Sequence, residues 1–115
     1  MPNEEQVQLA AESFRMLADP TRIKLLWALL QGESSVTCLA ELVGAGPTTV
    51  SQHLAKLRLA GLVTVRRDGR RACYSFADPH VRRLVTEALH AAEHRVTARP
   101  AHHRPPPDRA GLAPR

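Results

Sequence analysis

The sequence predicts a mainly α-helical fold with one small β-hairpin, arranged as a winged helix-turn-helix. Three observations lead to this prediction. Four stretches with apolar residues at helical spacing come first, and the last two are joined by a short glycine-containing turn. The pattern then changes to that of strands around Asp68-Gly69, a strong signal for a two-residue hairpin turn. Finally, a chain of 115 residues with 3% aromatic residues suits one domain with an aliphatic core.

The first two predicted helices are separated by Asp19-Pro20. Apolar residues recur at helical spacing over Glu4–Leu17, which indicates the first helix. Aspartate can cap a helix and proline suits its first position, so a second helix begins at Pro20. This helix is strongly apolar, and we expect it to end at Gly32.

The next two helices form the predicted helix-turn-helix. A short helix over Val36–Val43 opens after Ser34-Ser35, and the brief turn Gly44–Pro47 follows it. The fourth helix runs from Pro47 to about Ala60. We expect its core face to carry Val50, Leu54 and Leu57.

A hairpin and a last helix complete the domain. Residues Leu62–Arg67 and Arg70–Phe76 read as two strands. Asp78-Pro79 then opens a helix from His80 to about Ala98. We therefore expect residues 1–98 to form one DNA-binding and dimerisation domain. Residues 99–115, which are rich in Pro, Arg and His, are predicted to be a disordered tail.

The charge balance indicates a polyanionic partner. Lys and Arg number 16 against 11 Asp and Glu, which gives a net charge of +5 and a pI near 10.2. Nucleic acid is the commonest partner of such a surface, although a basic surface can also serve solubility. The two cysteines make no disulfide framework, and the N-terminus lacks the features of a signal peptide. No apolar stretch approaches the roughly 20 residues that span a bilayer, so we expect a cytoplasmic protein without membrane contact.

The fourth helix is the predicted reading element. Its polar face carries short side chains near the N-terminal end, which suits close approach to base edges. Gln, Ser and Thr can hydrogen-bond bases, whereas Lys meets phosphates. The predicted DNA contacts on this helix are Thr48, Thr49, Ser51, Gln52, His53 and Lys56.

The hairpin supplies a second predicted contact. Four arginines flank its turn and suit contact with phosphates or the minor groove: Arg66, Arg67, Arg70 and Arg71. Charges on a solvated edge hairpin can also simply prevent aggregation. The hairpin follows the helix-turn-helix at the distance expected of a wing, which favours DNA binding.

The outer helices predict a homodimer. A winged helix needs only its central helices for its own core, so the apolar stripes on Val7–Leu17 and Val81–Leu89 need a partner surface. A two-fold dimer presents two recognition helices to half-sites one turn apart. The expected partner is therefore a double-stranded palindromic operator.

Two segments carry a family resemblance. MLADPTRIKLLWAL and VSQHLAKLRLAGLV resemble the ArsR/SmtB family of bacterial metal-responsive repressors, and the resemblance covers about Val7 to His94. It implies a winged-helix homodimer that binds a palindromic operator and usually leaves the DNA when a metal binds.

Histidines concentrate after the hairpin. Five of the six lie there, at His80, His90, His94, His102 and His103, together with Asp78, Glu87 and Glu93. They form a pool of nitrogen and oxygen ligands without a thiolate. His80 and His94 share a helix face but lie ~21 Å apart along it. One metal ion could join them only across an antiparallel helix pair in a dimer, where it would report on dimer geometry.

A metal-ligand set is implied by the resemblance. The family pattern Asp-x-His-x10-His-x2-His matches Asp78, His80 and His94, but Ala91 stands at its third ligand position. The chain also resembles the KmtR-type nickel and cobalt sensors of this family, which implies the ligands His80, Glu93, His94, His102 and His103. Several nitrogen and oxygen ligands suit six-coordinate Ni(II) or Co(II), with Zn(II) as an alternative. Asp78 also reads as a helix N-cap.

Two other functions compete with metal sensing. His90-Ala91-Ala92-Glu93-His94 fits the HxxEH pattern of some metallopeptidases, but the chain offers neither a third ligand nor room for a cleft. The expectation is that the protein is not an enzyme. A regulator of the same fold could instead respond to an accessory protein or to oxidation of Cys38 or Cys73, and could activate rather than repress.

Overall fold

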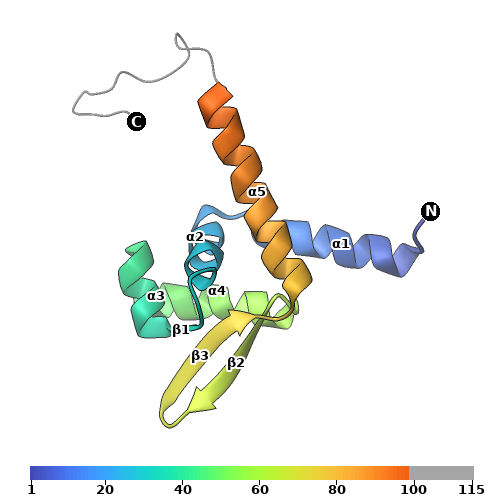
Figure 1. Ribbon diagram of the computed structural model, residues 1–115. Helices are drawn as coiled ribbons and strands as arrows, with labels where there is room; N and C mark the ends of the chain where they lie inside the picture. Colours follow the sequence, from blue (N-terminus) through green and yellow to red (C-terminus); the bar gives the residue numbers. More distant parts are fainter. Residues whose placement is uncertain (99–115) are drawn as a thin grey trace.

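A computed structural model of the chain describes residues 1–98 (Figure 1). It confirms the predicted winged helix-turn-helix. The predicted tail, with His102 and His103, lies outside the described residues. In order, the elements are α1 (Glu4–Leu17), α2 (Pro20–Leu29), β1 (Ser34–Ser35), α3 (Val36–Val43), α4 (Pro47–Leu59), β2 (Val63–Asp68), β3 (Arg71–Phe76) and α5 (Pro79–Ala98).

Side-chain caps set where the helices begin. Asn3 and Gln6 form a reciprocal capping box at the start of α1. The Arg22 amide donates to the carboxylate of Asp19 over 3.0 Å, and Pro20 occupies the first turn of α2, as predicted. Ser35 accepts from the Cys38 amide and caps α3. Each cap satisfies an amide that the helix itself leaves without a partner.

The core lies between α2, α3, α4 and the sheet. The three residues predicted for the inner face of α4, Val50, Leu54 and Leu57, are completely buried. They pack with apolar side chains of α2 and α3 in one cluster, which positions α4 on its support. Among residues 1–98, no helix is long and apolar enough to cross a membrane.

The sheet has a strand that the sequence did not reveal. Its order is β1-β3-β2, and all pairs are antiparallel. β1 consists of Ser34 and Ser35 alone, which pair with Tyr74 and Cys73. Two serines carry no apolar alternation, so only the long-range pairing identifies them as a strand.

The hairpin turn lies one residue later than predicted. Asp68 pairs with Arg71, so the two turn residues are Gly69-Arg70 rather than Asp68-Gly69. Gly69 has φ +65°, a left-handed conformation that glycine adopts without strain. The strand residues therefore begin and end at Val63–Asp68 and Arg71–Phe76.

The two outer helices differ in how they use their apolar faces. The expectation that Val81–Leu89 needs a partner was wrong in part, because Val81 and Val85 are buried in the core of their own chain. α1, by contrast, buries no residue and leaves Leu9 and Phe14 exposed. Figure 1 shows α1 extending to one side, while α5 rises away from the hairpin.

The burial of α4 gives a test of the fold. Leu57→Ala should lower the free energy of unfolding by about 2–5 kcal/mol, because a completely buried leucine leaves a cavity. Leu59→Ala is the control on the same helix: Leu59 is 89% exposed, and its removal should change stability by less than about 0.5 kcal/mol. Urea unfolding followed by circular dichroism measures both. Equal losses in the two variants would contradict the core assignment.

Candidate nucleic-acid interface and metal ligands

One face of α4 stays outside the core. The side chains that the sequence predicted as DNA contacts at Thr48, Thr49, Ser51, Gln52 and Lys56 are all exposed. Pro47 occupies the first turn of the helix and Gly46 gives no side-chain cap, so the beginning of α4 is not covered by a capping side chain. The helix therefore offers hydroxyl and amide groups that can hydrogen-bond base edges.

His53 differs from the other predicted contacts. It is half-buried, and its Nδ1 accepts a hydrogen bond from Nε of Arg22 over 3.2 Å. Arg22 belongs to α2, so one ring nitrogen of His53 is engaged within the protein. Local sequence patterns could not reveal this contact, because the two residues are 31 positions apart.

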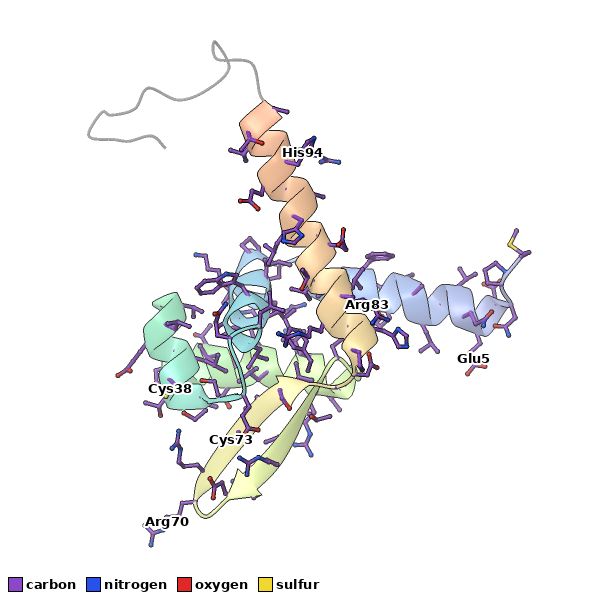
Figure 2. All side chains as sticks on the ribbon, viewed as in Figure 1. Glu5, Cys38, Arg70, Cys73, Arg83 and His94 are labelled. Atoms are coloured by element: carbon purple, nitrogen blue, oxygen red, sulfur yellow. The ribbon has the colours of Figure 1, made fainter. Side chains whose placement is uncertain are left out.

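Three of the four predicted wing arginines are free to meet a phosphate. Arg67, Arg70 and Arg71 are exposed, and Figure 2 shows Arg70 at the tip of the hairpin. Arg66 is instead paired with Glu33: its Nε lies 3.1 and 3.0 Å from the two carboxylate oxygens, and Nη2 also donates to the carboxylate. Sequence reasoning missed Glu33 because the contact joins residues 33 positions apart.

The Glu33–Arg66 pair has an electrostatic signature. The hydrogen bond from Arg66 lowers the pKa of Glu33, and its positive charge lowers that pKa further. The same hydrogen bond raises the pKa of Arg66. Both side chains remain substantially exposed, so the pair joins the hairpin to the residue directly before β1 without burying charge.

The predicted metal ligands within residues 1–98 lie along α5. His80, Glu93 and His94 are all exposed, and Figure 2 shows His94 far along the helix from the core. Nδ1 of His80 lies 2.8 Å from Nη2 of Arg83. Asp78 accepts from the Val81 amide over 3.0 Å, which is the N-cap contact that the sequence also allowed.

The described part of one chain does not assemble a metal site by itself. No three His, Cys, Asp or Glu side chains within residues 1–98 come close enough to hold one ion. His80 and His94 are separated along one straight helix, as their spacing predicted. The two cysteines of this range are free, Cys38 exposed and Cys73 buried.

Comparisons with known proteins identify a matching family and similar sequences. Residues 19–65 match the family described as bacterial regulatory protein, arsR family. The chain is 52% identical over 101 residues to the HTH-type transcriptional regulator KmtR of Mycobacterium tuberculosis, which covers 88% of this chain and 78% of that protein. It is 38% identical to a cadmium resistance transcriptional regulatory protein, a CadC homolog of Staphylococcus aureus, over 72% of this chain and 70% of the relative.

A solved structure shares the architecture. It is the homodimeric winged helix-turn-helix DNA-binding domain of a Mycobacterium bovis protein, with a TM-score of 0.77 and 30% identity. The match covers 89% of this chain and 97% of that domain. The fold of residues 1–98 is therefore also that of a homodimeric DNA-binding domain.

The wing makes a prediction about salt dependence. Arg70→Gln and Arg71→Gln should each reduce the slope of log affinity against log salt by about 1, because each free arginine can neutralise one phosphate. Arg66→Gln should change the slope less, because Glu33 already holds that guanidinium. Fluorescence anisotropy with a labelled duplex at several salt concentrations measures the slopes. If Arg66→Gln reduces the salt slope as much as Arg70→Gln does, DNA must displace Glu33 from Arg66.

Proposed function

The chain belongs to the arsR family of bacterial regulatory proteins, and from this premise we propose that it is a homodimeric transcriptional repressor controlled by Ni(II) or Co(II). The single observation that carries the DNA part is the exposed polar face of α4 beside an arginine-rich hairpin. Family membership in a group of regulators also argues against the metallopeptidase alternative, which rests on a five-residue pattern alone.

The proposed operator contacts divide by chemistry. Gln52, Thr48, Thr49 and Ser51 read bases, because amide and hydroxyl groups can form specific hydrogen bonds in the major groove. Lys56 and the free wing arginines contact phosphates and fix the position of the protein on the duplex.

The proposed dimer uses α1 and the outer part of α5. Leu9 and Phe14 of α1 are 62% and 60% exposed, and Val96 near the end of α5 is 55% exposed. Exposed apolar side chains on both outer helices suit a partner surface, and the similar Mycobacterium bovis domain is homodimeric. A two-fold dimer would match a palindromic operator.

The proposed effector is a transition metal. The relatives include a cadmium resistance regulator, and the resemblance to KmtR-type sensors favours Ni(II) or Co(II). His80, Glu93 and His94 are exposed and supply nitrogen and oxygen donors, which suit these ions. His102 and His103, outside the described residues, are proposed to complete the set. A bound ion would supply a bridge between these side chains.

Two variants should separate sequence-specific DNA binding from the response to metal. Gln52→Ala should weaken binding to a duplex selected by the wild-type protein about tenfold, because a bidentate base contact is lost. It should retain Ni(II) binding. The double variant His80→Ala/His94→Ala should bind the duplex like wild type but lose the response to Ni(II).

Anisotropy titrations with and without NiCl2, together with calorimetry, measure both properties. A double variant that still responds to Ni(II) would contradict the proposed ligands and leave the DNA-binding proposal intact. Unchanged duplex binding by Gln52→Ala would contradict the assignment of the reading face.

Arg83 should oppose metal binding at His80. A guanidinium only donates hydrogen bonds, so Nδ1 of His80 accepts from Arg83 and a neutral ring carries its proton on Nε2. An ion at Nδ1 would take the lone pair that accepts from Arg83. An ion at Nε2 would require the ring proton to be on Nδ1, which could then no longer accept, so this hydrogen bond must break in either case. Arg83→Met should therefore raise Ni(II) affinity by about three- to tenfold, the value of one modest hydrogen bond.

The control is Arg95→Met, which removes the same charge beside His94 on the same helix. Calorimetric titration of the full chain with NiCl2 compares them. Equal gains in both variants would show that general charge, not the hydrogen bond to His80, opposes the ion.

A further inference from the structure

Arg22 joins three elements through separate hydrogen bonds. Its backbone amide donates to Asp19, the cap of α2. Its Nη1 donates to the carbonyl oxygen of Met16 in the last turn of α1 over 3.1 Å. Its Nε donates to Nδ1 of His53 on α4 over 3.2 Å. One half-buried side chain thus connects the N-terminal helix directly to the recognition helix.

The contact with Met16 serves the end of α1. The last four carbonyls of a helix have no partner within it, and Met16 supplies one of them. α1 buries no residue in this chain and packs mainly against α2. Because so little packing holds α1, a charged hydrogen bond at its last turn has a large share in setting its direction.

The contact with His53 acts on α4. In the sequence of α4, His53 follows Gln52 of the reading face and precedes the buried Leu54. The buried Val50 lies three positions earlier. Since arginine cannot accept a hydrogen bond, Nδ1 of His53 must be the acceptor. Asp19 caps α2 beside Arg22, and the hydrogen bond from the Arg22 amide lowers the pKa of its carboxyl.

We propose that Arg22 and His53 are positioning residues that fix the recognition helix relative to the N-terminal helix, and that His53 acts through Arg22 rather than by contacting DNA. The proposal rests on the proposed function, in which α1 belongs to the dimer surface. It replaces the expectation that His53 is a direct DNA contact. In a dimer, the direction of α1 relative to α4 helps determine the distance between the two reading helices, and hence the half-site spacing.

Two substitutions at His53 separate positioning from direct contact. The amide of asparagine places its oxygen close to where Nδ1 lies, whereas the longer glutamine places its polar atoms near Nε2. His53→Asn should keep the acceptor for Arg22 and bind the selected duplex within about threefold of wild type. His53→Gln should lose that acceptor and bind about tenfold more weakly, because a hydrogen bond to a charged group is lost.

Half-site spacing gives a readout that simple destabilisation would not change. The probes are the duplex that the wild-type protein selects from a randomised library and versions with one base pair added or removed between half-sites. Wild type and His53→Asn should prefer the selected spacing. His53→Gln should lose most of that preference, because α4 is no longer tied to α1.

Arg22 completes the test by a double-mutant cycle. Arg22→Met removes both donors, so adding His53→Gln to it should cause no further loss of affinity. Arg22→Lys supplies a single amine in place of the guanidinium, so its affinity for the duplex should lie between those of Arg22→Met and wild type. Thermal unfolding and sedimentation of each variant check folding and dimer formation, and if Arg22→Met does not fold, the two His53 variants decide.

Each outcome has one meaning. Wild-type binding by His53→Gln together with weak binding by His53→Asn would overturn the proposal and make His53 a DNA contact through Nε2. Equal losses in both, with normal folding, would overturn it as well. If the wild-type chain enriches no duplex, the proposed function itself fails. This outcome is distinct from failure of the positioning proposal, because it appears with the wild-type chain before any His53 variant is compared.

Discussion

The other elements of the fold are arranged around the buried face of α4. Val50, Leu54 and Leu57 are completely removed from solvent, and each such side chain contributes roughly 1.5–3 kcal/mol through burial. These residues recur every three or four positions, so they fix the rotation of the helix about its own axis. The hydroxyl and amide groups between them consequently face outward. The exposed polar face of α4 is thus a consequence of packing, and no separate interaction is needed to expose it.

Ser35 transmits that constraint to the hairpin. Its backbone pairs with Cys73 of β3, while its hydroxyl accepts from the Cys38 amide at the start of α3. The residue is buried, so both contacts are shielded from water. The same short segment therefore ends a strand, caps a helix and sets the hairpin against the helix-turn-helix. The Glu33–Arg66 pair adds a second link from the hairpin to this segment.

Local signals predicted the helices, whereas long-range contacts escaped prediction. Asp19-Pro20 and the apolar spacing of α4 act within a few residues, so the sequence contains their full cause. β1, the Glu33–Arg66 pair and the Arg22–His53 bond join residues more than 30 positions apart, and only the folded chain brings them together. The turn position shifted by one residue because pairing across the strands, not the Asp-Gly dipeptide alone, sets the register.

α5 divides into a half that packs on the core and a half that is exposed, and this division bears on how the proposed ion could act on the core. Val81 and Val85 are buried, and Arg82 donates to the carbonyl oxygen of Leu30 over 3.0 Å. From residue 90 to residue 98 every side chain is exposed, and the helix extends away from the core (Figure 1). Under the proposed function, His80 lies on the packed half of α5 and His94 on the exposed half, so an ion held by both would involve the two halves together. The packed half contacts α2, the helix that carries Arg22 and its bond to α4.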